Sequence, residues 1–202
     1  SGFRTESLAL IVSLLFTLLS NGAFWSALTA QRESLSPDTW RIAFFTGLAL
    51  TGLHWFLLLL PVNRWIARPL FAALLLATAA AAYFMSTYGI YLDKSMIRSL
   101  VETDVREASE LLDGKLLLAV AVYGALPAWL LWRLPIRPVA LRQSAAFRTA
   151  CIAIALSMIA VGVWAAADVL VPGLREHKAT RYLVTPSNYL VSLAGVLAGT
   201  PI

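Results

Sequence analysis

Long uncharged, apolar stretches dominate the chain, and they do not alternate apolar and polar positions. A helix needs about 20 residues to cross the hydrocarbon core of a bilayer, with a range of about 17 to 25. Backbone amides in lipid must be paired internally, so a membrane span without alternation is a helix. The uncharged runs, the last interrupted by Asp168, are Ser7 to Gln31, Ile42 to Asn63, Pro69 to Leu92, Leu116 to Trp132 and Thr149 to Leu174.

These runs predict an all-α membrane protein with five transmembrane helices in a domain that covers residues 1–174. The expected spans are about 7–30, 40–60, 69–88, 116–132 and 149–171. Ser36-Pro37-Asp38 offers an N-cap, a first-turn proline and a first-turn acid for the second helix. Pro61 is expected to end that helix and Pro69 to begin the third. Pro127 is expected to kink the fourth span, unless neighbouring groups pair the freed carbonyl.

Two segments outside the spans have the pattern of helices at a membrane surface. Residues 93–112 place apolar side chains at helical spacing, with Asp93 as a candidate N-cap and Gly114 as a candidate stop. Such an amphipathic helix lies in the interface plane with its apolar face in lipid. Thr185-Pro186 opens a shorter helix within the segment 175–202, and this helix is too short to span. Both interfacial helices are expected on the outer face.

The charge distribution predicts how the chain is oriented in the membrane. Hydrophobic residues make up 59% and charged residues 13% of the sequence, against about 25% charged residues in a soluble domain. With the N-terminus in the cytoplasm, the inner segments carry seven arginines and one acid, Glu6, and the loops 61–68 and 133–148 are short and basic. Positive residues concentrate in cytoplasmic loops. The net charge of +5 is therefore explained by topology, nucleic acid is not an expected partner, and the C-terminus is expected outside.

The sequence lacks recognisable catalytic and metal-binding motifs. Its two histidines, His54 and His177, form no metal pair, and the single cysteine, Cys151, excludes a disulfide and a thiolate cluster. We expect no catalytic residue, metal or cofactor in this chain. His54, inside the second span, is either a packed neutral imidazole that shares a hydrogen bond with a neighbouring helix or a buried functional residue; the first is favoured because no acid lies near it within a span. A small transporter is disfavoured, because acids and broken helices at mid-membrane are not evident.

One polar stripe in the segment 93–112 suits a lipid headgroup. Ser99, Thr103 and Glu107 recur every four residues along the border of the apolar face. A carboxylate there could pair with an ammonium group, and the hydroxyls could hydrogen-bond a phosphate or an amine. An ordinary solvated polar edge is the alternative explanation.

The sequence around this stripe resembles a known family. Tyr88-Gly89, Asp93, Met96-Ile97 and Glu102-Thr103-Asp104 with Glu107 recur in this order in the signature loop of the inner-membrane phosphoethanolamine transferases that modify lipid A. That family includes the mobile colistin-resistance enzymes. The stretch Arg181 to Asn188 also resembles the segment that follows the fifth span in those proteins.

The resemblance implies that this chain is the membrane half of an enzyme. Family members carry a periplasmic alkaline-phosphatase-like domain with zinc and a threonine nucleophile. That domain takes phosphoethanolamine from phosphatidylethanolamine and passes it to a lipid A phosphate, which reduces the negative charge that polymyxins bind. The domain and its zinc are expected beyond Ile202, so the chain alone is expected to be inactive. The implied partners are phosphatidylethanolamine, lipid A and the protein's own catalytic domain, at the bacterial inner membrane.

The resemblance also suggests site residues. In several family members an Asn, a Thr and a Glu of the loop help to form the donor-headgroup site, and Thr103 and Glu107 match this pattern. Ser99 stands where those family members have the Asn, and a serine hydroxyl lacks the second donor and the reach of the asparagine amide. The candidate substrate-binding residues are Ser99, Thr103, Glu107, Tyr88, Tyr91 and Asn188. Their expected role is to position the donor lipid; a non-catalytic anchor, or a sister transferase with another headgroup or acceptor, has the same layout.

Overall fold

The structure is a computed structural model, and it describes residues 2–29, 36–61, 65–89, 113–137, 141–170 and 184–190, the side chains of 141–144 excepted. The helices are α1 (Thr5–Leu15), η1 (Phe16–Ser20), α2 (Gly22–Thr29), α3 (Pro37–Leu59), α4 (Ala67–Tyr88), α7 (Gly114–Ala119), η2 (Val120–Ala125), α8 (Leu126–Arg133) and α9 (Leu141–Ala165). Within the described ranges the chain has no strand, and one isolated bridge joins Phe3 and Ile136. The all-α prediction is confirmed for these residues.

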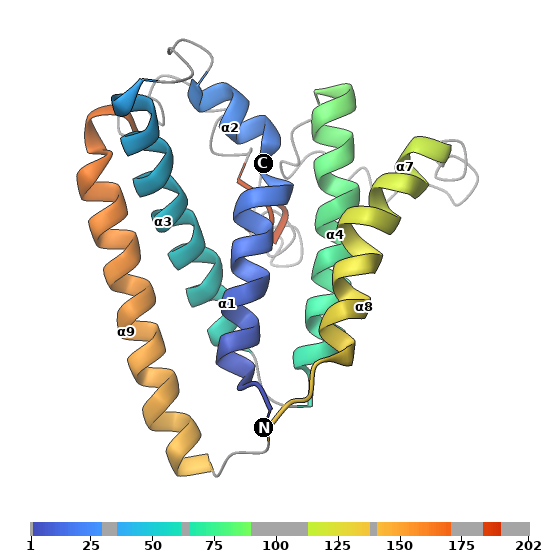
Figure 1. Cartoon of the computed structure of the whole chain (residues 1–202), viewed down its shortest axis with the longest axis vertical. Helices are drawn as coiled ribbons and strands as arrows, with labels where there is room; N and C mark the ends of the chain where they lie inside the picture. The colour runs from blue at the N-terminus through green and yellow to red at the C-terminus, as the bar shows by residue number, and fades with distance from the viewer. Residues whose placement is uncertain are drawn as a thin grey trace, which may run out of the picture.

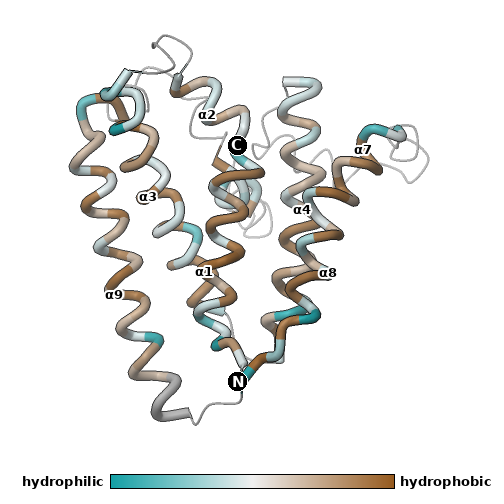
Figure 2. The backbone as a smooth tube through the Cα atoms, in the orientation of Figure 1, coloured by the Kyte–Doolittle hydropathy of each residue, from teal (hydrophilic) through white to brown (hydrophobic). Residues whose placement is uncertain are grey.

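Four helical stretches are long and apolar enough to cross a membrane: Pro37–Leu59, Ala67–Tyr88, Gly114–Arg133 and Ala145–Ala165. They overlap the second to fifth predicted spans. Figure 1 shows α3 and α9 side by side on one side of α1, and α4 with α7 and α8 on the other. Apolar residues follow the lengths of these helices, and polar residues gather mainly toward their ends (Figure 2). The chain is therefore a helical membrane protein.

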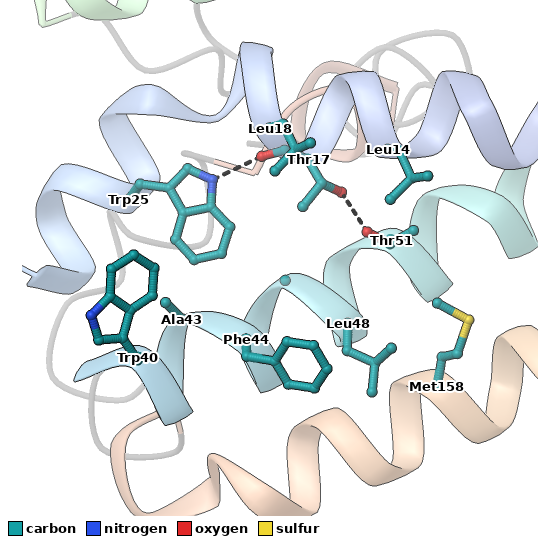
Figure 3. A pocket seen from close by; sticks show the side chains of 11 residues that line it. Leu14, Thr17, Leu18, Trp25, Trp40, Ala43, Phe44, Leu48, Thr51 and Met158 are labelled. Atoms are coloured by element: carbon teal, nitrogen blue, oxygen red, sulfur yellow. Dashed lines mark hydrogen bonds between the residues drawn. The ribbon is translucent and has the colours of Figure 1, made fainter. Parts of the chain in front are cut away.

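The first predicted span, about 7–30, is not one straight helix. α1 passes into the π-helical turn η1, and the chain breaks at Asn21 before α2, which is bent away by 58°. The Asn21 amide donates to the Phe16 carbonyl at 2.7 Å, and the Trp25 indole donates to the Thr17 carbonyl at 2.8 Å (Figure 3). The helix expected over about 7–30 is therefore bent at Asn21, because an Asn-Gly pair combines low helix propensity with a side-chain amide that replaces backbone pairing.

Two predicted helix boundaries are confirmed and one is shifted. Ser36 caps α3, since its Oγ accepts a hydrogen bond from the Thr39 amide at 3.1 Å, and α3 ends before Pro61. α4 begins at Ala67 rather than at Pro69. The amides of the first helical turn have no acceptor within the helix, so proline is tolerated there.

Pro127 does not break the fourth span. The residues Val120–Ala125 immediately before α8 form the π-helical stretch η2, and Pro127 lies in the first turn of α8. Proline has no amide hydrogen, and its ring clashes with the carbonyl four residues earlier. A widened helical stretch accommodates both effects. The effect expected of Pro127 is therefore accommodated by the π-helical stretch, and the span stays continuous over Gly114–Arg133.

Small residues bring α3 and α9 into close contact. A methyl group added to Gly52 would lie 2.8 Å from the Ala155 carbonyl oxygen, and one added to Gly162 would lie 2.7 Å from the Ala49 nitrogen. Lipid tails are as apolar as a protein core, so helix association in a membrane depends on such close packing. On its other side α3 shares with α1 and α4 a core that includes Leu8, Val12, Phe16, Trp55, Leu59, Phe71 and Leu75.

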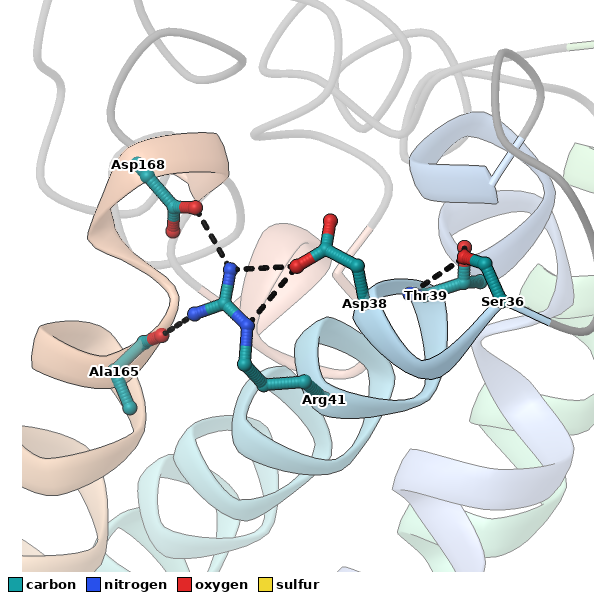
Figure 4. A network of polar contacts seen from close by, with 6 residues as sticks. All are labelled: Ser36, Asp38, Thr39, Arg41, Ala165 and Asp168. Atoms are coloured by element: carbon teal, nitrogen blue, oxygen red, sulfur yellow. Dashed lines mark hydrogen bonds and ion pairs between the residues drawn. The ribbon is translucent and has the colours of Figure 1, made fainter.

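An arginine joins the start of α3 to the end of α9. The Arg41 guanidinium pairs with Asp38 at 2.9 Å and with Asp168 at 2.8 Å, and it donates to the Ala165 carbonyl at 2.6 Å (Figure 4). Ala165 is the last residue of α9, and carbonyls at a helix end lack partners within the helix. The network therefore serves α9 as a C-terminal cap.

Two buried polar residues connect α1 and η1 to their neighbours. His54 Nδ1 lies 3.5 Å from the Thr17 hydroxyl, and the imidazole packs edge-on against Phe16. His54 is thus packed and contacts a neighbouring helix, as the first of the two interpretations expects. Glu6 of α1 is buried and pairs with Arg148 of α9 at 3.5 Å.

Candidate functional site

One end of the bundle brings together four segments: the end of α4, the start of α7, the break in the first span and residues 184–190. α4 ends at Tyr88, and Gly89 follows in the left-handed conformation with φ 64°. Glycine adopts this conformation without the steric cost of a side chain. The chain leaves α4 at this turn, where the segment 90–112 begins.

Asp113 caps α7 and ties it to α4. Its Oδ1 accepts a hydrogen bond from the Leu116 amide at 2.7 Å, and the Tyr83 hydroxyl donates to the two carboxylate oxygens at 3.1 and 3.0 Å. The bond from the Leu116 amide lowers the pKa of Asp113; desolvation opposes this shift and the bond from Tyr83 reinforces it. Because Tyr83 lies near the end of α4, both ends of the segment 90–112 are anchored at the same end of that helix.

Acidification is expected to loosen the start of α7. A carboxyl group whose pKa is lowered by folding stabilises the folded state above its ordinary value of about 3.9, and it loses this contribution as the pH falls through the lower folded value. The Asp113→Asn variant should lack this acid-dependent loosening, because asparagine does not titrate. Hydrogen exchange at the Leu116 amide, compared between the two proteins, measures the effect. The same pH dependence in both proteins would contradict the role of Asp113.

Aromatic side chains surround the end of α4. The Tyr88 ring stacks on Phe84 with centroids 5.8 Å apart, and it lies 6.4 Å from the Tyr83 ring. Tyr88 is nevertheless 53% exposed. Tyrosine rings are enriched at the level of lipid headgroups, where one end of the ring is apolar and the other is hydrated. The Tyr88 ring is thus packed against neighbouring rings at the end of α4 and is still accessible from outside the protein.

The break in the first span is also where residues 184–190 dock. The Asn21 amide donates to the Thr185 carbonyl at 2.8 Å, and Asn21 Oδ1 accepts a hydrogen bond from the Thr185 amide at 2.9 Å. The Thr185 hydroxyl donates to the Ser20 carbonyl at 2.8 Å. All three residues are buried. A segment 164 residues downstream is therefore fixed against the broken helix.

The same segment contacts α4. Asn188 is buried, and its amide nitrogen lies 3.7 Å from the Met85 sulfur. The Tyr189 and Thr78 hydroxyls are 2.8 Å apart. Burial raises the pKa of Tyr189 to about 12, so this phenol stays protonated at neutral pH. Asn188 thus lies within the contact that holds the segment on α4.

A hollow of about 660 Å³ lies between the first-span break, α4 and the start of the fourth span. Many of its lining residues are small, and those with hydroxyl groups are Ser20, Ser26, Tyr83, Ser86 and Tyr123. Small-molecule sites are commonly hollows of roughly 300–1,000 Å³ with a few polar groups. Such hydroxyls can bind phosphate or amine groups. Among the described residues no group of three His, Cys, Asp or Glu side chains could hold a metal ion.

The candidates from the sequence fall into two groups. Ser99, Thr103, Glu107 and Tyr91 lie outside the described residues, so their roles stay predictions. Tyr88 and Asn188 are described, and the structure brings both to the last turns of α4. Tyr88 is accessible there, whereas Asn188 is enclosed.

Sequence reasoning missed the residues that hold the site together. Asp113 ahead of an apolar run carries an N-cap signal, and Gly114, expected as a stop for the preceding segment, is the first residue of α7. Asn21 followed by glycine is a break signal within an apolar run. Tyr83 and Thr185 carry no comparable local signal, because their partners are 30 and 164 residues away.

Comparison with known proteins finds sequence relatives. The family model described as phosphoethanolamine transferase EptA/EptB matches residues 50–200. Phosphoethanolamine transferase EptA from Escherichia coli (strain K12) is 32% identical over 129 residues, which cover 63% of this chain and 24% of that protein. Phosphatidylethanolamine transferase Mcr-1 from Escherichia coli is 27% identical over 128 residues, with the same coverage. The matches thus span only 24% of the length of these curated relatives.

A solved structure has the same fold. It is the integral membrane protein lipooligosaccharide phosphoethanolamine transferase A (EptA) from Neisseria meningitidis, with a TM-score of 0.88 and 18% sequence identity. The likeness covers 98% of this chain and 37% of that chain.

Proposed function

Because the chain belongs to the phosphoethanolamine transferase EptA/EptB family, we propose that it is the membrane domain of an inner-membrane enzyme that moves phosphoethanolamine from phosphatidylethanolamine to lipid A. The domain anchors the enzyme and positions the donor lipid. The threonine nucleophile and zinc belong to a catalytic region of the full-length enzyme outside these 202 residues. The transfer lowers the negative charge of lipid A and so protects the cell from polymyxins.

The link between Tyr83 and Asp113 is the observation that carries this proposal. It holds Asp113 beside the hollow that Tyr83 lines, so the residues that flank the segment 90–112, Gly89 and Asp113, both lie at the end of α4. That segment contains the predicted polar stripe with Glu107. The described residues that line the hollow offer hydroxyl groups, and none of them is a carboxylate. A carboxylate for the donor's ammonium group would therefore come from the anchored segment. We assign Glu107 to the ammonium group, and Thr103 with the hydroxyls of the hollow to the phosphate.

Positioning is the contribution of this domain to the reaction. A lipid held by its headgroup at the end of α4 keeps its acyl chains in the bilayer and its phosphoryl group at the surface. The catalytic region then reacts with a group that is already oriented, and the entropy of capturing a free substrate is not lost at that step.

The charges at the two ends of the bundle support an orientation with the site on the periplasmic side. The described bases at the end where α1 and α9 begin are Arg4, Arg68, Arg133, Arg137 and Arg148. These outnumber the described acid at that end, Glu6, whereas the opposite end has three described acids, Asp38, Asp113 and Asp168, against two described bases, Arg41 and Lys115. Because positive residues favour the cytoplasmic side, the N-terminus is cytoplasmic and residues 184–190 are periplasmic. The amphipathic helices of the outer face would lie in the periplasmic interface.

Replacing Glu107 by glutamine in the full-length enzyme is expected to lower transfer at least about tenfold. A hydrogen bond to a charged group is worth about 1.5–3 kcal/mol, and each 1.4 kcal/mol is a factor of about ten. Mass spectrometry of lipid A from cells with equal enzyme levels measures the change, and polymyxin susceptibility should rise with it.

Glu102→Gln is the matched control, because Glu102 lies in the same segment but off the Ser99, Thr103 and Glu107 stripe. It should leave transfer unchanged. Unchanged transfer in Glu107→Gln would remove Glu107 from the site. If the enzyme kept its activity after an unrelated membrane anchor replaced the whole domain, the domain would be an anchor only.

A further inference from the structure

A second hollow lies on the other side of the first span from the one that Tyr83 lines. It has a volume of about 510 Å³. We call it the apolar groove; it runs between Leu14, Leu18 and Trp25 of the first span and Ala43, Phe44 and Leu48 of α3 (Figure 3). Figure 3 shows the two tryptophans of the groove, Trp25 and Trp40, at one end and Met158 of α9 at the other.

The groove follows the axis of α3. Its α3 wall extends from Trp40 through Gly47 to Thr51, which share one face because they are spaced by whole helical turns. At 1.5 Å per residue this stripe is about 16 Å long. One leaflet of the hydrocarbon core is about 15 Å thick. Because α3 crosses the membrane, the groove has the length and direction of an acyl chain in one leaflet.

The polar groups of Thr17, Trp25 and Thr51 in the walls are already paired within the protein. The Trp25 indole donates to the Thr17 carbonyl at 2.8 Å, and the Thr51 hydroxyl donates to the Thr17 hydroxyl at 3.1 Å. The Thr17 hydroxyl in turn donates to the Ser13 carbonyl at 3.0 Å. These groups need no hydrogen bond from an occupant, so the groove suits a hydrocarbon.

The groove opens onto the lipid-facing surface of the bundle. Leu18 is 68%, Phe44 66% and Trp40 62% exposed, and all three line the groove. Large apolar side chains exposed on a membrane-spanning helix contact lipid tails. The groove is therefore continuous with the established interface between the protein and lipid, and lipid is what meets its opening.

We propose that the apolar groove binds one acyl chain of a membrane phospholipid, in the leaflet on the side of α2. Bulk lipid tails are as apolar as the groove, so the hydrophobic effect does not favour binding over the surrounding bilayer. The preference arises from many weak contacts with fixed walls. The acyl chain is selected by its shape, and the lipid headgroup is not bound by the groove. The site therefore does not depend on the proposed transfer reaction or on Glu107.

Photolabelling with lipids tests the proposal. The full-length enzyme in lipid nanodiscs is irradiated with phosphatidylethanolamine or phosphatidylglycerol that carries a diazirine in one acyl chain. The peptide containing Leu48 should be labelled about tenfold more than the peptide around Leu118, an exposed residue of α7, the preference expected from summed packing contacts. Both lipids should label equally, and unlabelled phospholipid should compete. These measurements require no variant, so they do not depend on the folding of one.

Variants that fill the groove provide the second arm. A methyl group at Gly47 would contact the Trp25 ring at 3.5 Å, so Gly47→Leu places a larger group in the groove, and Ala43→Phe fills it from the next turn. Both should lose the saturable labelling. Val161→Phe, on the exposed surface of α9, should retain it. Labelling that is equal at all lipid-facing peptides, that depends on the headgroup, or that only lipid A displaces would overturn the proposal.

Discussion

Replacing Gly162 by leucine is expected to destabilise the membrane domain by about 3 kcal/mol, the upper end of the usual cost of overpacking. A side chain at this position would overlap the carbonyl oxygen of Phe45 and would lie 2.7 Å from the amide nitrogen of Ala49. Both atoms belong to the backbone of α3, so space appears only if α3 and α9 separate. Unfolding in mixtures of mild and denaturing detergent measures the loss.

Gly47→Ala is the matched control, because Gly47 is also a glycine of a membrane-spanning helix. Its added methyl group would lie 3.5 Å from the Trp25 ring, an ordinary van der Waals contact. Alanine is favoured over glycine in a helix by up to about 1 kcal/mol, so this variant should be as stable as the original protein or slightly more so. If both variants unfolded at the same detergent fraction, the close α3–α9 contact would be refuted.

Asn21→Ala is expected to cost about 3 kcal/mol, because each of three hydrogen bonds contributes about 1 kcal/mol. The lost bonds are those to the Phe16 carbonyl and to the carbonyl and amide of Thr185. These groups are buried around Asn21 and would have no water to replace it. The variant should therefore release residues 184–190 from the first span as well as lower the stability. Faster hydrogen exchange at the Thr185 amide would report the release.

Ser86→Ala serves as the comparison for this second prediction. The Ser86 hydroxyl donates to the nearby Tyr83 carbonyl, at 3.0 Å, and the residue is exposed. Surface changes of this kind usually shift stability by less than about 0.5 kcal/mol. Exchange at the Thr185 amide that was as slow in Asn21→Ala as in Ser86→Ala would show that Asn21 does not hold the segment.

The spans that sequence reasoning located well are those in which a long apolar run ends in clear local signals. Ser36 and Pro61 mark the ends of α3 by capping and by the missing proline amide, and these signals act within one helical turn. The bend of the first span was not predicted, because the length and composition of the run match those of a straight helix. Asn21-Gly22 is a local break signal, but the pairing of Asn21 with Thr185 joins residues 164 positions apart, which a local pattern does not reveal.

The same reasoning applies to the site. The stripe of Ser99, Thr103 and Glu107 was predicted because helical periodicity places residues four apart on one face, and it stays a prediction since these residues lie outside the described part of the chain. Tyr88 was found by resemblance, and its accessible place at the end of α4 is a property of the fold. The bond between Tyr83 and Asp113, which anchors the segment that carries the stripe, joins residues with no shared periodicity.

Run length, charge and capping residues are local quantities, so the sequence alone determined that the chain is helical, that it lies in a membrane and roughly where the second to fifth spans lie. The tertiary structure decided where the first span breaks, where residues 184–190 dock and which hollows the helices enclose. These features depend on hydrogen bonds and close packing between distant residues. In lipid the hydrophobic effect does not select one helix pairing over another, so such contacts specify the arrangement.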